Sequence, residues 1–117
     1  MADLPSTRLS ELALEISCEL EPTTRWRVAP GLVADVDAGL LRVLLTGVLL
    51  GAERAGAADV LVAQHGDGSF FVWADRDFEV SCPGTCRRIV RRYGGELGGD
   101  GTEVVRFRFG GTPAAVR

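Results

Sequence analysis

The stretch from residue 38 to residue 54, AGLLRVLLTGVLLGAER, limits what this chain of 117 residues can fold into. Its leucines and valines lie on nearly every side of a helix, so the helix has to pack against neighbours on more than one side. We expect it to begin after Asp37, whose carboxylate is a good N-cap, and to end near Arg54. A chain of this length supports one modest core. We therefore expect residues 1–117 to form a single domain around this helix.

Two glycines, Gly47 and Gly51, lie inside this otherwise apolar helix. Each costs about 1 kcal/mol relative to alanine in a helix interior. Something should therefore approach the helix backbone closely at both positions. A neighbouring element of the fold and a bound ligand would both explain the pattern, and of the two we favour packing by a neighbour.

The rest of the chain is divided by turn signals into shorter elements. An apolar stripe predicts a first helix over residues 8–20 with Thr7 as its cap, and Gly94-Gly95 is expected to end a third, amphipathic helix that follows Cys82-Pro83. The remaining predicted elements are strands at 24–28, 59–63 and 69–74, a short strand after Gly95, a last strand at about 103–109, and loose ends at 1–7 and 112–117. The order α, β, α, β, β, α, β, β predicts an α+β two-layer sandwich. Its mixed, mostly antiparallel sheet would be covered on one face by three helices.

Charge and composition exclude several classes of function. The net charge is −3, although the part from Arg87 onward carries seven arginines against three acidic residues, a net charge of +4. That excess is small for a duplex-binding surface, so we expect no nucleic-acid partner. The apolar run at 40–52 is too short to span a bilayer, so we expect no membrane contact by this segment and a cytoplasmic location, alone or as part of a membrane-bound sensor. Three cysteines and one histidine do not form a zinc ligand set.

Three stretches of the sequence carry a resemblance to a known family. They are DAGLLRVLLTGVLLGAERAG, FFVWADRDFE and RRIVRRYGGELGGDGTEVVRFRF. They resemble, respectively, the N-box helix, the adenine-recognition strand and the final helix with its hairpin in the catalytic, ATP-binding domains of bacterial sensor histidine kinases. Those domains belong to the GHKL group of ATPases, which have the Bergerat fold. The resemblance extends from about Leu9 to Phe109.

The resemblance implies a site for ATP or ADP with Mg²⁺. Asp75, or in reserve Asp77, would accept the adenine amino proton, and Thr102 beside Gly101 would support the base. Backbone N–H groups at the start of the third helix favour phosphate. The remaining residues implied for the nucleotide are Gly51, Arg54, Gly84, Thr85 and Arg87, with Glu53 as a substitute metal ligand or catalytic base.

The sequence also departs from the family pattern. The family's metal-binding asparagines are replaced at the matching positions by Gly47 and Gly51, so the metal ligands are unknown. The D-x-G-x-G motif is replaced by residues 75–79, DRDFE, and the glycine-rich lid is reduced to about residues 81–85.

Two functions follow as hypotheses. The first is an atypical kinase domain that binds or hydrolyses ATP and supplies the phosphoryl group to a histidine on a separate dimerisation domain, in signalling to a response regulator. The second is a pseudokinase domain that has lost the nucleotide and docks a response regulator or another signalling protein.

Overall fold

The structure, a computed structural model, describes residues 6–20, 22–99 and 101–109. Of the expected loose ends at 1–7 and 112–117, residues 1–5 and 112–117 lie outside the described residues, and Thr7 belongs to a strand. The helices of the described part are α1 (Leu9–Ser17), α2 (Ala38–Arg54) and α3 (Pro83–Arg92). The strands are β1 (Thr7–Arg8), β2 (Arg25–Val28), β3 (Val33–Ala34), β4 (Asp59–Gln64), β5 (Phe70–Phe78), β6 (Glu96–Gly98) and β7 (Thr102–Arg108).

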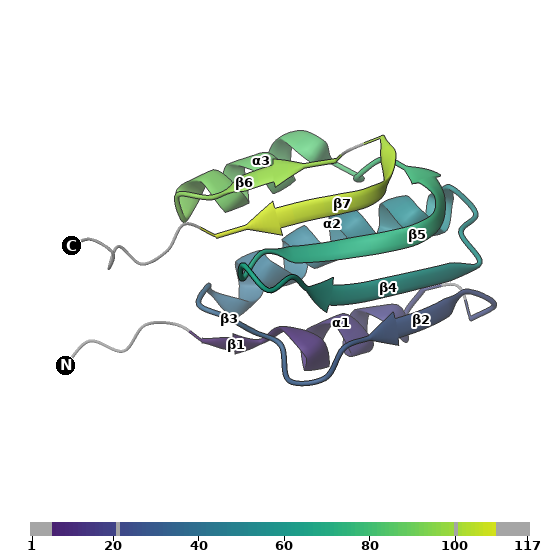
Figure 1. Ribbon diagram of the computed structural model, residues 1–117, viewed down its shortest axis with the longest axis horizontal. Coiled ribbons are helices and arrows are strands. Elements are labelled where there is room, and N and C mark those ends of the chain that lie inside the picture. Colours follow the sequence, from purple (N-terminus) through teal and green to yellow (C-terminus); the bar gives the residue numbers. More distant parts are fainter. Residues whose placement is uncertain (1–5, 21, 100, 110–117) are drawn as a thin grey trace.

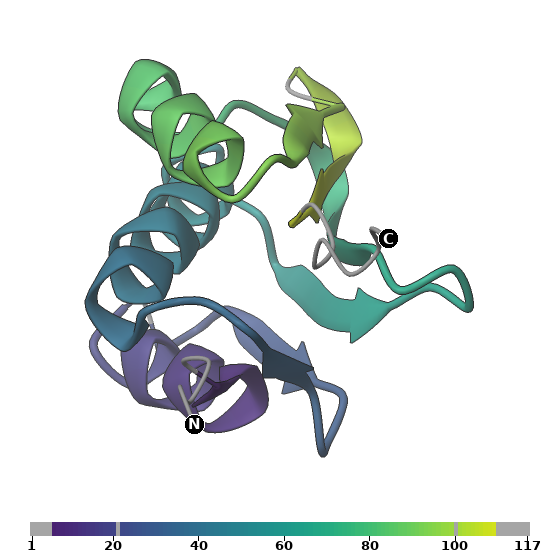
Figure 2. The same cartoon turned by 90° about the vertical axis from the view of Figure 1, so that its left-hand side faces the viewer.

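A five-stranded sheet with the order β2-β4-β5-β7-β6 forms one layer of the domain (Figure 1). Strands β2 and β4 are parallel, and every other pair in this sheet is antiparallel. The three helices lie together on one face of the sheet, as the side view shows (Figure 2). This arrangement confirms the predicted two-layer sandwich with its mixed, mostly antiparallel sheet.

Helix α2 is the centre of the core, as its sequence predicts. It has the expected bounds, and the Asp37 carboxylate accepts a hydrogen bond from the Leu40 N–H at 3.1 Å. Five of its aliphatic side chains have no exposed surface: Leu41, Leu44, Leu45, Val48 and Leu49. Its neighbours α1 and α3 lie on its two sides (Figure 2). The helix is therefore enclosed by helices and sheet together, which explains why it is apolar almost all round.

The start of the chain differs from the prediction. Thr7 is not a helix cap: it lies in β1, which pairs with β3, and its hydroxyl donates a hydrogen bond to the Val36 carbonyl at 2.7 Å. Helix α1 begins at Leu9 without a side-chain cap and ends at Ser17, so it is shorter than the predicted 8–20. The long-range bond to Val36 takes the hydroxyl that would otherwise cap the helix.

Strand β5 continues further than its sequence predicts. It includes Asp75, Arg76 and Asp77, which we expected to follow the strand, and it ends at Phe78. Its pairing with β7 is irregular between Trp73 and Phe78, where a bulge shifts the register. With this bulge, the strand extends past the acidic stretch, and the residues that follow it lie against α2.

Helix α3 packs as an amphipathic surface helix. Cys86, Ile89 and Val90 are buried, and the Tyr93 hydroxyl accepts a hydrogen bond from the Asp37 N–H at 3.0 Å. Gly94 has a φ of +74° directly after the helix, as the predicted glycine end requires. In the described part of the chain, no helix has the length and apolar character needed to cross a bilayer.

Candidate functional site

The connector between β5 and α3, residues 79–81, lies directly on helix α2. A Cβ atom placed on Gly51 would lie 2.0 Å from the Glu79 carbonyl oxygen, and one on Gly47 would lie 2.7 Å from both the Ser81 carbonyl oxygen and the Cys86 Sγ. The Ser81 N–H also donates a hydrogen bond to the Gly47 carbonyl at 2.9 Å. The two glycines are therefore needed because a neighbouring backbone crosses the helix, which confirms the packing explanation.

A groove of about 370 Å³ lies beside this crossing, between α2 and the start of α3. It is lined by Arg42, Val43, Thr46, Gly47, Leu50, Ser81, Cys82, Thr85 and Cys86. Val43 is 46% exposed, which leaves an aliphatic side chain in contact with water at the groove. Its walls are mainly apolar, with hydroxyl groups on the α3 side. The groove can therefore accept a flat or apolar group, and it offers few fixed charges.

Most groove residues were missed by the sequence analysis. Val43, Thr46, Gly47 and Leu50 recur at helical spacing on α2, so they share one face of that helix. Surplus apolar positions of this kind are the signal that could have revealed the groove. We had instead assigned them to core packing.

The predicted adenine ligand, Asp75, has a local structural partner. Its carboxylate accepts a hydrogen bond from the Ala58 N–H at 3.0 Å, in the loop between α2 and β4. Its reserve, Asp77, is exposed on β5. Neither residue lines the groove between α2 and α3.

Of the predicted residues at the end of α2, Arg54 contacts the connector. Its guanidinium donates a long hydrogen bond of 3.4 Å to the Ser81 hydroxyl. Glu53, the candidate base, is half-buried one residue earlier. The Arg54–Ser81 bond therefore joins the end of α2 to the connector.

The predicted residues from α3 onward fall in three separate places. Thr85 lines the groove, and Gly84 is exposed beside it. Arg87 lines a different hollow of about 240 Å³ between α3 and β6. Gly101 has a φ of +89° in the turn between β6 and β7, and the neighbouring Thr102 hydroxyl bonds to the carbonyls of Gly99 and Val104.

Of these predicted residues, the structure thus brings Thr85 to the groove and leaves Gly84 and the two aspartates outside its lining. No group of three or more histidine, cysteine, aspartate or glutamate side chains is arranged to hold a metal ion within the described ranges.

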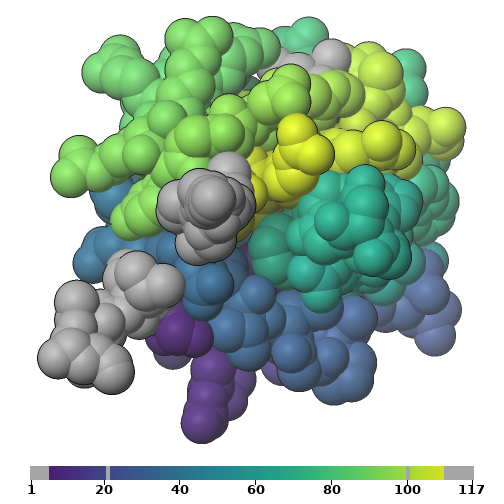
Figure 3. Space-filling view, turned by 60° about the vertical axis from the view of Figure 1, so that its left-hand side comes forward, coloured from purple at the N-terminus to yellow at the C-terminus, as the bar shows by residue number. Residues whose placement is uncertain are grey.

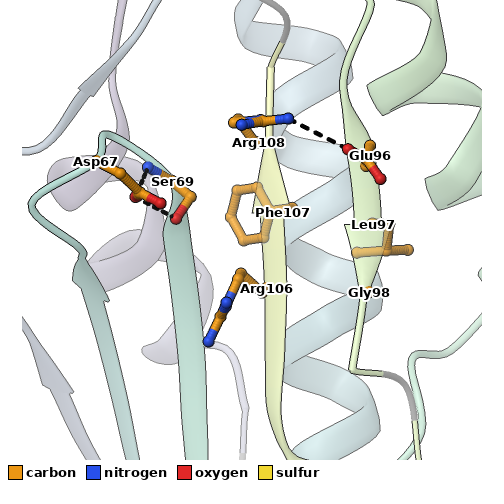
Figure 4. Close-up of a pocket in the computed structure, with 8 residues that line it drawn as sticks. All are labelled: Asp67, Ser69, Glu96, Leu97, Gly98, Arg106, Phe107 and Arg108. Atoms are coloured by element: carbon orange, nitrogen blue, oxygen red, sulfur yellow. Dashed lines mark hydrogen bonds and ion pairs between the residues drawn. The ribbon is translucent and has the colours of Figure 1, made fainter.

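A second hollow, of about 260 Å³, lies at the strand ends near the turn between β4 and β5 (Figure 4). Asp67 accepts hydrogen bonds there from the Ser69 hydroxyl at 2.7 Å and the Ser69 N–H at 2.9 Å. These two bonds, the hydroxyl first, lower the pKa of the Asp67 carboxyl below its ordinary value. Across the hollow, Arg108 pairs with Glu96 at 3.2 Å. No residue predicted for the nucleotide lines this hollow. The two bonds between Asp67 and Ser69 stabilise the turn between β4 and β5.

Comparison with known proteins places the fold. No family model and no curated protein sequence matches the chain. Among solved structures, the nucleotide-free catalytic domain of the histidine kinase ThkA superposes with a TM-score of 0.69. The match covers 97% of this chain and 99% of that domain, at 14% sequence identity. The chain therefore has the fold of a GHKL-type histidine kinase catalytic domain, in a divergent sequence, and the resemblance seen in the sequence is confirmed at the level of fold.

Proposed function

We propose that this chain is a signalling domain of the sensor-kinase type that works by binding a partner protein and has lost metal-dependent phosphoryl transfer. The observation that carries the proposal is the contact at Gly51, where a Cβ would lie 2.0 Å from the Glu79 carbonyl oxygen. The family resemblance assigns the metal-binding asparagine of this helix to Gly47 or Gly51. With the connector in this place, neither position has room for any side chain.

Phosphoryl transfer makes demands that the rest of the site does not support. The reaction needs charge neutralisation and in-line positioning of the phosphates. Arg54 is turned to Ser81, and the Asp75 carboxylate is bonded to the Ala58 N–H. In this proposal both side chains have structural roles.

The partner follows from the fold as an inference. A domain with this architecture is expected to work beside the histidine-bearing dimerisation domain of a kinase, or with a response regulator. Without phosphoryl transfer, it would contribute position and contact surface to that assembly.

The groove between α2 and α3 favours a second candidate function, which is nucleotide binding. Its volume of about 370 Å³ and its apolar walls suit a purine, and Gly84 and Thr85 lie at the start of α3, where backbone N–H groups favour phosphate. In this candidate ATP, or ADP, binds with Mg²⁺ held by the phosphates and water, and the γ-phosphoryl group passes to a histidine of the dimerisation domain.

Calorimetric titration of the whole chain with ATP and ADP, with and without Mg²⁺, distinguishes the two candidates. We expect no heat of binding at millimolar nucleotide. Binding would overturn the proposal, and two variants would then locate the nucleotide. Loss with Thr85→Trp, which narrows the groove, places it there, whereas loss with Asp75→Asn alone supports the adenine contact implied by the family resemblance.

A further inference from the structure

The outer side of helix α3 carries three arginines, Arg88, Arg91 and Arg92, which we call the arginine face. All three are exposed, and they lie opposite the buried Cys86 and Ile89. Side chains of α3, in green, project from the surface on this side of the molecule (Figure 3). We propose that the arginine face is a docking surface for an acidic helix of a partner protein, an inference that rests on the proposed binding function and gives its partner a chemistry.

The first support is that these charges have no partner among the described residues. No hydrogen bond or ion pair is formed by the three side chains with any residue that the structure describes. Helix α3 itself contains no acidic residue. Three neighbouring guanidinium groups are thus presented to solvent together.

The second support is that the three arginines lower the stability of helix α3. Arg88 lies three residues from Arg91 and four from Arg92, and like charges at these spacings repel one another along a helix. Arginines at the C-terminal end of α3 interact favourably with the helix dipole, but this offsets the repulsion between them only in part. Solubility alone does not require charges of one sign, because alternating positive and negative side chains would keep this surface equally well solvated.

Helix α1 shows the contrast within the same molecule. Its acidic side chains are paired: Glu15 and Glu19 with Arg42 of α2, at 2.7 and 3.4 Å, and Glu11 with Arg8 at 3.2 Å. The acidic charges of α1 are therefore matched, and the three charges of the arginine face have no partner among the described residues. To reach the arginine face, the α1 carboxylates of a second copy would have to leave Arg8 and Arg42.

The chemistry of the partner follows from number and spacing. Arginine binds carboxylates through two parallel N–H···O bonds, and one helical turn of arginines matches one helical turn of glutamates. A nucleic acid needs several phosphate contacts, and the chain as a whole carries a net charge of −3, which repels a long polyanion. An acidic helix presents its charges on one short face and avoids that repulsion.

The test uses a fluorescein-labelled helical peptide with glutamates at spacings of three and four, and a second peptide of the same composition whose glutamates are scattered. Fluorescence anisotropy with the whole chain should show binding of the first peptide and at least about tenfold weaker binding of the second. Arg88→Glu should weaken binding of the first peptide by about tenfold. The matched control is Arg25→Glu, at an exposed position of β2. It makes the same charge change and should leave binding nearly unchanged.

A second readout separates docking from misfolding. Arg88→Glu places a glutamate three and four residues before arginines, which favours the helix, so the variant should melt at a higher temperature than the parent chain. A more stable variant that has lost the peptide supports the proposal. The proposal is overturned by any of three results: no peptide binding at millimolar concentration, equal loss with Arg25→Glu, or tighter binding of an oligothymidylate of equal charge.

Failure here would leave the proposed function standing with a different docking surface. Nucleotide binding in the calorimetric titration would overturn the proposed function and leave the peptide result unaffected. The two experiments therefore fail independently.

Discussion

Asp75 shows how one carboxylate supports two different interpretations. From the sequence it is the residue best placed to read an adenine, because it ends an apolar run that resembles the family's recognition strand. In the structure its oxygen accepts the Ala58 N–H at 3.0 Å, and so it fixes the loop between α2 and β4. Sequence position cannot distinguish these roles, because both need an acceptor at the same point of the strand.

Substitution of Asp75 separates the structural role from the binding role. Asp75→Ala removes the acceptor and should lower the free energy of unfolding by about 1 kcal/mol, whereas Asp75→Asn retains an acceptor oxygen and should cost clearly less. Urea denaturation followed by tryptophan fluorescence measures both values. Equal losses for the two variants would contradict the structural role.

Asp67 makes a prediction about pH. Its pKa is lowered in the folded chain, chiefly by the Ser69 hydroxyl, so the carboxylate contributes stability above the pKa of the unfolded chain. That contribution is lost as the pH falls through the lowered, folded-state pKa. A carbon-detected NMR titration should find the pKa of the Asp67 carboxyl below the ordinary aspartate range. Ser69→Ala should raise this pKa, and an unchanged pKa would show that the Ser69 hydroxyl is not the cause.

At the scale of elements, helix α2 was predicted almost completely from the sequence. Its bounds, its Asp37 cap and its enclosure on several sides follow from the local sequence pattern. Gly47 and Gly51 predicted that another element lies close to the helix backbone. The identity of that neighbour could not be predicted. Glu79 and Ser81 approach the two glycines through their backbone carbonyl oxygens, and a backbone contact leaves no side-chain pattern in the contacting segment.

Paired glycine substitutions test the crossing of α2 by the connector. Gly51→Ala should lower the free energy of unfolding by about 1–3 kcal/mol, because the added Cβ meets the Glu79 carbonyl and the gain in helix propensity does not offset the clash. Gly84→Ala, in helix α3, has nothing within 4 Å of the added Cβ. It should raise stability by up to about 1 kcal/mol, and chemical denaturation measures both. A stabilised Gly51→Ala would mean that the connector does not rest on α2.

At the scale of the whole molecule, the order of the helices and the longer strands was predictable because each has a clear period and clear turn residues. The pair formed by β1 and β3 was missed, since two-residue strands have no period to detect. The parallel pairing of β2 with β4 is likewise decided by the packing of α1 and α2 against the sheet. The fold could therefore be predicted from local patterns and resemblance together.

The candidate site was less predictable than the fold for a physical reason. Residues carried over from the family as one pocket are distributed here over a groove, a β-turn, an exposed strand and a loop-fixing contact. A binding site depends on the path of its loops to within an ångström or so, and no local sequence pattern predicts the path of the segment after β5. Thr85 lines the groove as part of a helix, whose position the core fixes.

The Ser81–Gly47 hydrogen bond and the two filled glycine notches also have a mechanical consequence. They fix the connector that leads into α3 against the middle of α2, so we expect the connector and α2 to move together.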